Sequence, residues 1–318
     1  MKTAPLTTND VYENTQFESS TVSLAQSIKC CQKVVATYDR TFYWGSWLMP
    51  RQQREAMWSV YAWFRQKDER IDGPEPLRTK RHLLKQWFQQ LDALFLSEQP
   101  ATATDVALLD AIKRYHLSIE TFQDMLKGQQ MALELDRYRT WQDLWLYCYR
   151  VAGTVGLVST SIFGVEADST TCDALITFGI AMQLTNILQD VGIDARRGKV
   201  YLPLEDLKRC QYSVEDIFKS VSQQPVLNQQ WSTLIGYEIQ RTRALYAQVE
   251  EVIGKLPKDV LWSMWTAWLL YQQDLIVIER NHYHVFEGRH HVPLLWKVNA
   301  LMLAWWRSLK LAFSTANS

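Results

Sequence analysis

The sequence predicts an all-α protein with a single folded domain, and three observations support this. Glycine and proline are scarce, at 12 and 9 of 318 residues, and long stretches place apolar residues at helical spacing. No segment rich in proline, glycine or serine divides the chain. We therefore expect a disordered tail over 1–20 and one domain over 21–318, for which 47% hydrophobic residues can supply the core.

The first half of the domain is expected to consist of helices. A first helix should run from about Val22 to Tyr38. Pro50 suits the first turn of a long helix over Arg51–Asp72, whose middle is apolar on nearly every side and is therefore buried. Gly73-Pro74 should end it. The next periodic segments are Leu77–Leu96, Asp105–Tyr115 and about Ser118–Leu133.

The second half continues the same pattern. Thr140, with Asp143 three residues later, resembles a helix N-cap. It opens a helix that runs to Phe163, in which Gly153 and Gly156 would let neighbouring helices approach closely. The remaining expected helices are Asp173–Asp194, short ones at Glu205–Arg209 and Ser213–Ser220, then Gln229–Ile253, Pro257 to about Phe286, and Pro293–Phe313.

Charge and cysteine content exclude several classes of protein. Lysine plus arginine and aspartate plus glutamate both number 34, so the chain has no overall attraction for nucleic acid. The first twenty residues carry one lysine and three acids, unlike a secretory signal or a transit peptide. We expect a cytoplasmic protein, in a reducing compartment because its cysteines are odd in number and form no C-x-x-C pair. They are Cys30, Cys31, Cys148, Cys172 and Cys210.

Two acid pairs recur at the ends of apolar helices. Asp68 and Asp72 are four residues apart, so both carboxylates lie on one helix face, with Arg65 one turn before. Alone, such a pair is usually a solvated surface feature. Like charges at this spacing destabilise a helix, however, and this pair ends a buried one. A second Asp-x-x-x-Asp pair, Asp190 and Asp194, ends another apolar helix.

The second pair belongs to a longer polar stripe. At about 100° per residue, Gln183 and Asn186 share one face with Asp190 and Asp194, while the other face is apolar. The following segment, 196–199, adds three cations and a glycine. Two acid pairs facing one cavity would repel each other, and divalent cations offset that repulsion. Mg2+ binds carboxylates together with phosphate oxygens while arginine or lysine neutralises the rest, so the pattern predicts a metal and diphosphate site.

The chain resembles the squalene/phytoene synthase family, in particular its plant and cyanobacterial type. Five separated blocks carry the resemblance in the right order over about residues 25–290. They are Thr41-Phe42-Tyr43 with Leu48-Met49-Pro50, Tyr61–Asp72, Leu146–Tyr149 leading into Val151–Gly156, Leu184–Pro203, and Asn281, Tyr283, Val285 and Phe286.

The resemblance implies an isoprenoid-synthase helical bundle with a central cavity, in which Mg2+, or alternatively Mn2+, holds prenyl diphosphates. It implies head-to-head joining of two geranylgeranyl diphosphates through prephytoene diphosphate to phytoene, in carotenoid biosynthesis, with a carotenoid desaturase as a downstream partner. Metal and cations would stabilise the departing diphosphate, and an apolar wall would keep water from the carbocation.

The family's functional residues carry over position by position. The implied metal ligands are Asp68, Asp72, Asn186, Asp190 and Asp194, and Tyr147 matches a cavity tyrosine linked to the second ionisation. The implied substrate-binding residues are Arg40, Thr41, Phe42, Arg65, Gln183, Asn186, Arg197, Tyr271 and Arg289.

The chain also departs from the family pattern. Gln189 stands where many relatives have arginine, so one diphosphate contact could be missing. Ile193 replaces an acid commonly found between the aspartates of the second pair, and Gln272 and Asp274 interrupt a usually basic and apolar stretch. None of these changes removes an aspartate of the two pairs, so we still expect activity.

The last segment, Pro293–Phe313, allows two interpretations. One face is apolar, Arg307 and Lys310 lie on the other, and there is no acid. It could lie on a membrane surface, or it could cover the core with its basic residues outward. For the whole chain, three rival hypotheses remain: a squalene or dehydrosqualene synthase that uses farnesyl diphosphate, a non-catalytic relative acting as an assembly factor, and a structural bundle with surface acid pairs.

Overall fold

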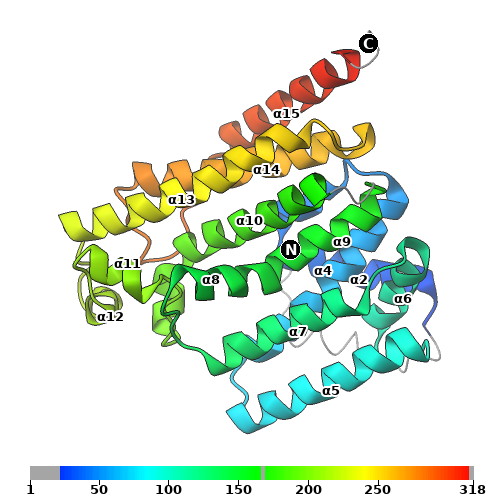
Figure 1. Ribbon diagram of the computed structural model, residues 1–318, viewed down its shortest axis with the longest axis horizontal. Helices are drawn as coiled ribbons and strands as arrows, with labels where there is room; N and C mark the ends of the chain where they lie inside the picture. Colours follow the sequence, from blue (N-terminus) through cyan, green and yellow to red (C-terminus); the bar gives the residue numbers. More distant parts are fainter. Residues whose placement is uncertain (1–21, 166–168, 315–318) are drawn as a thin grey trace, which may run out of the picture.

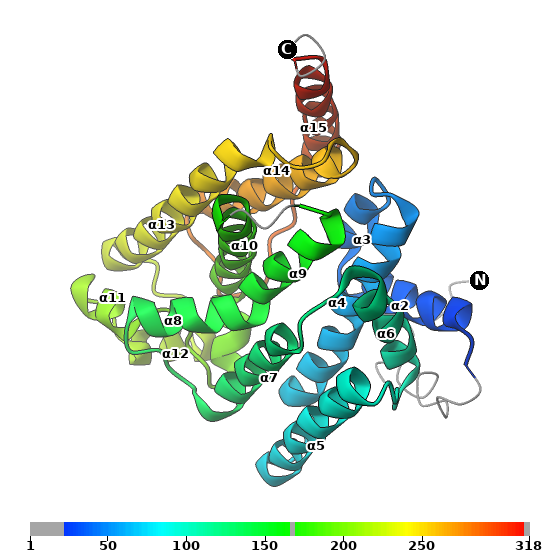
Figure 2. The ribbon, with the colours of Figure 1, turned by 45° about the vertical axis from the view of Figure 1, so that its right-hand side comes forward.

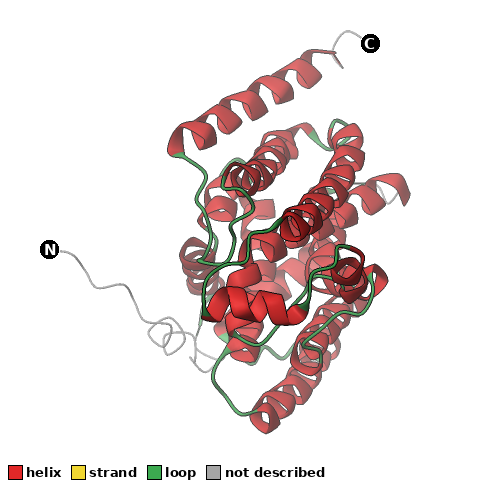
Figure 3. Cartoon of the chain, turned by 90° about the vertical axis from the view of Figure 1, so that its left-hand side faces the viewer, coloured by secondary structure: helices red, strands yellow, loops and turns green. Residues whose placement is uncertain are grey.

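The computed structural model describes residues 22–165 and 169–314, with the side chains of 40, 41, 169 and 311–314 left out. In these ranges the chain consists of helices joined by loops (Figure 3), and its one β-bridge is an isolated contact between Arg137 and Val200. The prediction of an all-α fold is confirmed. The tail expected over 1–20 lies outside the described residues.

Five of the first six helices follow the predicted pattern closely (Figure 1), whereas the short helix α3 was not predicted. Pro50 proves to be the N-cap of α4 rather than its first residue, and nine residues of α4 are buried, which confirms the expected core helix. The bounds are α2 (Leu24–Tyr38), α3 (Arg40–Ser46), α4 (Arg51–Asp72), α5 (Leu77–Leu96), α6 (Ala103–Tyr115) and α7 (Ile119–Glu134).

Two of the later predicted helices are corrected. The helix expected from Thr140 to Phe163 contains a π-helical turn, η2, and the one expected to reach Phe286 ends at Arg280. The bounds are α8 (Trp141–Cys148), η2 (Tyr149–Gly153), α9 (Thr154–Phe163), α10 (Ser169–Arg196), α11 (Leu204–Arg209), α12 (Val214–Ser222), α13 (Gln229–Ile253), α14 (Lys258–Arg280) and α15 (Leu294–Ser314).

Close helix packing accounts for the π turn. A Cβ atom on Gly179 of α10 would lie 2.2 Å from the carbonyl oxygen of Ala152 in η2. One on Gly128 of α7 would lie 2.8 Å from a methyl group of Val151. The wider turn therefore brings the backbone of η2 against two helices at once, where only glycine fits.

The long helix α10 is the centre of the bundle and lies between α8, α9 and α13 (Figure 2). The close approach expected at Gly156 is confirmed, because a Cβ there would lie 2.1 Å from the carbonyl oxygen of Leu175. By length and apolar composition alone, α10 is the one helix of the described ranges that could cross a membrane. However, 56% of its apolar window is buried inside the bundle, as expected for a core helix.

A buried ionic cluster anchors the chain that follows α10. Arg241 of α13 donates to Asp206 of α11 at 2.8 Å and to Glu238 at 3.0 Å. Both acidic side chains are almost fully buried, and burial raises the pKa of Glu238 to about 8. The Arg241 guanidinium also lies over the ring of Trp141, 4.3 Å from its centroid. We call these four residues the α11–α13 clamp.

The final helix packs through its small residues. Ala300 and Ala304 are fully buried, and Arg307 lies over the ring of Trp265 and donates to Glu250 at 2.9 Å. As one interpretation expected, α15 therefore covers the bundle, but Arg307 turns toward α13 and α14 rather than outward. The exposed apolar residues of α15 are Leu294, Leu295, Val298, Leu301, Met302, Leu303, Trp305 and Trp306.

Candidate active site

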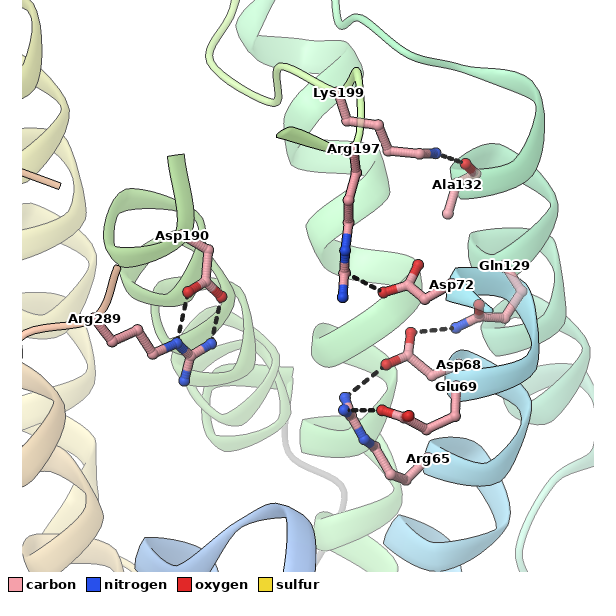
Figure 4. A network of polar contacts seen from close by, with 10 residues as sticks. All are labelled: Arg65, Asp68, Glu69, Asp72, Gln129, Ala132, Asp190, Arg197, Lys199 and Arg289. Atoms are coloured by element: carbon pink, nitrogen blue, oxygen red, sulfur yellow. Dashed lines mark hydrogen bonds and ion pairs between the residues drawn. The ribbon is translucent and has the colours of Figure 1, made fainter. Parts of the chain in front are cut away.

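The first aspartate pair lies at the C-terminal end of α4, facing α10 (Figure 4). Arg65 donates to Asp68 at 2.8 Å and also to Glu69. Gln129 of α7 donates to the other oxygen of Asp68 at 3.3 Å. Burial raises the pKa of Asp68 to about 6 despite Arg65, and Asp72 raises it further. The carboxylate thus lies where its charge needs a compensating cation.

The second pair lies at the C-terminal end of α10. Asp190 accepts two hydrogen bonds from Arg289, one of them at 2.6 Å from Nε. Burial raises the pKa of Asp194 to about 7, with Asp190 and Asp72 as further causes. Because Asp72 of α4 acts on Asp194 of α10, the two helix ends share one electrostatic site.

The segment after α10 connects the two ends. Arg197 donates to Asp72 at 2.9 Å, and Lys199 donates to the carbonyl of Ala132 at the end of α7. Burial lowers the pKa of Lys199. Arg196, the third cation of this segment, donates instead to the carbonyl of Phe286 at 2.8 Å. Of the three cations noted in the sequence, Arg197 therefore binds an aspartate of the two pairs, whereas Lys199 and Arg196 bind backbone carbonyls.

The other residues expected in the site are distributed as follows. Gln183 and Asn186 are half-buried on α10, on a face otherwise bordered by buried residues. The ring of Phe42 lies 5.3 Å from that of Tyr61. Burial strongly raises the pKa of Tyr271. The side chains of Arg40 and Thr41, in the first turn of α3, lie outside the described residues.

Three tyrosines form an aromatic cluster beside Asp194. The ring of Tyr147 lies 5.2 Å from those of both Tyr138 and Tyr201, and burial raises the pKa of all three. The sequence indicated only Tyr147. Tyr201 lies inside the matching block that ends at Pro203, so that block could have indicated it, whereas Tyr138 and Gln129 carried no pattern of their own.

The departures Gln189 and Asp274 pair with each other. Gln189 is buried on α10, and its side chain is hydrogen-bonded to Asp274 of α14. Burial raises the pKa of Asp274 to about 6. The amide at position 189 therefore has a hydrogen-bond partner in Asp274. The two departures from the family pattern can thus be understood as one paired change. The structure gives no comparable role to Ile193 or Gln272.

The donor set fits a hard divalent cation. In the described residues, the oxygen Oε1 of Gln129 and the hydroxyl of Tyr138 are buried without a hydrogen-bond partner, although such atoms are normally satisfied. No three acids, histidines or cysteines of the described ranges are close enough to hold one ion by themselves. Mg2+ suits this arrangement, because it binds one or two carboxylates and completes its shell with water and phosphate oxygens.

The structure contains two cavities, and the smaller one lies at the expected binding site. A small one of about 10 Å³ is lined by Ile187, Val191, Asp194 and the segment 199–202. A larger one of about 400 Å³ lies elsewhere, lined by 50–53, Tyr115 and 161–164. The small cavity opens beside the aspartates and the tyrosine cluster, and a central cavity large enough for the substrate stays a prediction.

Comparison with known proteins identifies the family. Residues 35–296 match the family model for squalene/phytoene synthase. The 15-cis-phytoene synthase of Synechococcus elongatus is 41% identical over 90% of this chain and 94% of its own. That of Synechocystis sp. is 42% identical over 90% of this chain and 86% of its own. A crystallised dehydrosqualene synthase superimposes with a TM-score of 0.79 at 25% identity, over 89% of this chain and 97% of its own. The chain therefore belongs to the squalene/phytoene synthase family.

Proposed function

We propose that this chain is a 15-cis-phytoene synthase, a prenyltransferase that joins two geranylgeranyl diphosphates head to head for carotenoid biosynthesis. The observation that carries the proposal is the pair of opposed helix ends, with Asp68 and Asp72 on α4 and Asp190 on α10 (Figure 4). Asp194 of α10 interacts electrostatically with Asp72, and Arg197 donates to Asp72. The relatives at 41% and 42% identity, both 15-cis-phytoene synthases, support this choice within the family.

The aspartates would hold Mg2+, or Mn2+ in its place, with Asn186 and Gln183 beside the second pair. When bound, the metal would neutralise the diphosphate as it leaves. Arg65, Arg197, Lys199 and Arg289 would bind the diphosphate oxygens. The remaining candidate residues, Arg40, Thr41, Phe42 and Tyr271, would bind the substrate at the α3 and α14 side.

The rings beside Asp194 would act on the prenyl chain. Tyr138, Tyr147 and Tyr201 present aromatic faces next to the site, and such faces stabilise a nearby cation. Because burial raises their pKa values, the hydroxyls stay protonated at neutral pH and can donate hydrogen bonds to a departing diphosphate. We propose that Tyr147 serves the second ionisation in this way.

The direct test is product analysis. Recombinant protein supplied with Mg2+ and geranylgeranyl diphosphate should form a C40 hydrocarbon with a conjugated triene chromophore. A folded sample that returns only unreacted diphosphate would contradict the proposal. A non-catalytic assembly factor would behave in that way, but such a protein would be expected to lose metal aspartates, and this chain keeps four.

The second candidate is a squalene or dehydrosqualene synthase, because the solved dehydrosqualene synthase superimposes well on this chain. The two candidates share the aspartate site and differ in chain length of the substrate. An assay in which farnesyl and geranylgeranyl diphosphate compete at equal concentration separates them. We expect the C40 product to dominate, and a C30 product would favour the second candidate.

We further propose that the enzyme contacts a membrane through α15, as a peripheral protein of the cytoplasm, and that a carotenoid desaturase consumes its product. Met302 and Trp305 are 65% and 50% exposed. Besides Arg307, which pairs with Glu250, α15 carries Lys297 and Lys310 and no acid. An apolar face with basic flanks favours the surface of an anionic bilayer.

Replacing Met302 and Trp305 together by glutamate should weaken flotation with phosphatidylglycerol-containing vesicles at least about tenfold, because two apolar anchors are lost. Leu96→Glu is the matched control, since Leu96 is 77% exposed at the end of α5, and it should float as the wild type does. Equal flotation of the double variant and the wild type would remove α15 from the proposal.

A further inference from the structure

Arg289 binds Asp190 differently from the other arginines of the site. It reaches both carboxylate oxygens, whereas Arg197 makes one contact to Asp72 and Arg65 divides its contacts between Asp68 and Glu69. Its hydrogen bonds with Asp190 raise the pKa of Arg289, so the guanidinium is a permanent cation. Planar two-point pairing of this kind is the strongest form of ion pair in proteins.

The segment before Arg289 contains a stretch of backbone that is held on α10 and a glycine with a positive φ. The backbone at Phe286 is held on α10, because Gly192 donates to the carbonyl of Val285 at 3.2 Å and a Cβ on Gly192 would lie 2.2 Å from the Phe286 oxygen. Gly288 follows with φ of +135° and open space around it. On the other side of Arg289, the ring of His290 is hydrogen-bonded to the carbonyl of His284 at 2.6 Å. The backbone around Arg289 is therefore held at both ends, and its long side chain can leave Asp190 without moving α10.

A guanidinium and a divalent cation compete at one carboxylate. Both are positive, and at a few ångströms their repulsion in a partly buried site amounts to kilocalories per mole. Asp190 is the first acid of the proposed α10 metal site. A diphosphate nearby would offer the guanidinium a second planar acceptor of higher charge. The position of Arg289 therefore depends on which anion is present.

We propose that Arg289 is an exchangeable partner of Asp190. It holds the carboxylate in place and weakens metal binding when no diphosphate is present, and it transfers to the diphosphate when one binds. Metal and diphosphate then bind cooperatively, because each favours the position of Arg289 that the other requires. This inference rests on the proposed metal and diphosphate site.

The test uses Mn2+ alone, followed in solution by electron paramagnetic resonance, with inorganic pyrophosphate as the second probe. Arg289→Gln should bind Mn2+ at least about fivefold more tightly than the wild type without pyrophosphate. In the wild type, pyrophosphate should tighten Mn2+ binding beyond what Mn2+-pyrophosphate complexes in solution explain. In Arg289→Gln, this enhancement should fall by a similar factor.

Two further variants make the result specific. Arg243→Gln removes an equally bidentate pair outside the site, with Glu279 at 2.7 and 2.6 Å, and should leave Mn2+ binding unchanged. Arg289→Lys keeps the positive charge but not the planar guanidinium that binds both oxygens, so its Mn2+ affinity should lie between those of the wild type and Arg289→Gln. The two variants at this position allow the test to be made even if one of them folds poorly.

The outcomes separate the inference from the proposed function. If Asp190→Asn abolishes Mn2+ binding but Arg289→Gln binds Mn2+ no more tightly than the wild type, the exchange is overturned and the metal site stands. If the wild type binds no Mn2+ even with pyrophosphate present, or binds it equally well after Asp190→Asn, the metal site fails and the exchange fails with it.

Discussion

Asp190→Asn is expected to lower kcat/KM for geranylgeranyl diphosphate at least about 100-fold, a loss comparable to that of one transition-state contact. The substitution removes one negative charge from the α10 pair and leaves Arg289, which binds both oxygens of Asp190, without its acid. The change is nearly isosteric and the side chain is only partly buried, so folding should be retained. Steady-state kinetics with saturating Mg2+ measures the effect.

The matched control for Asp190→Asn is Asp110→Asn. Asp110 also accepts from an arginine with both oxygens, at 3.1 and 3.0 Å from Arg114, but on the exposed side of α6. Its substitution should leave kcat/KM within about twofold of the wild type, as for an ordinary surface ion pair. Equal rates for the wild type and Asp190→Asn would favour the structural interpretation, in which the acid pairs are surface features.

Much of the fold and part of the site could be predicted because both depend on local patterns. Helical periodicity specifies α4 and α10, Gly73 ends α4 as predicted, and i, i+4 spacing places each aspartate pair on one face. The resemblance then supplied residues far apart in sequence, such as Arg289, whose contact with Asp190 no periodicity reveals.

The remaining features depend on tertiary packing. The π turn of η2 follows from the approach of Gly128 and Gly179, and no pattern within 149–153 indicates it. Gln129 joins the site only because α7 lies beside α4. The inward position of Arg307 depends on tryptophans of α14. Contacts of this kind exist only after distant helices have met.

Arg241→Met is expected to lower the free energy of unfolding by about 3 kcal/mol, the loss typical of breaking a buried ion pair from one side. Methionine keeps most of the aliphatic stem of Arg241 but removes the guanidinium that lies over Trp141. Asp206 then keeps only Arg209, whose side chain is 51% exposed. Arg243→Met is the control. Its pair with Glu279 is more exposed, so its loss should cost about 1 kcal/mol or less. Urea denaturation measures both.

The double variant Asp206→Asn/Arg241→Met tests whether an unpaired buried charge causes the loss of stability in Arg241→Met. If the α11–α13 clamp stabilises by pairing, the double variant removes the charges of Asp206 and Arg241 together. Glu238 stays buried, but its pKa of about 8 keeps it largely protonated at neutral pH, so the double variant should recover much of the loss. A double variant as unstable as Arg241→Met would instead indicate lost packing on Trp141. The clamp holds α11, and the chain that joins α10 to α11 carries Arg197 and Lys199. At the start of α11, Leu204 also donates to the carbonyl of Tyr138 at 2.9 Å. Recovery of stability should therefore be accompanied by recovery of KM for the diphosphate substrate, because the same contacts that stabilise α11 fix the cations of the site.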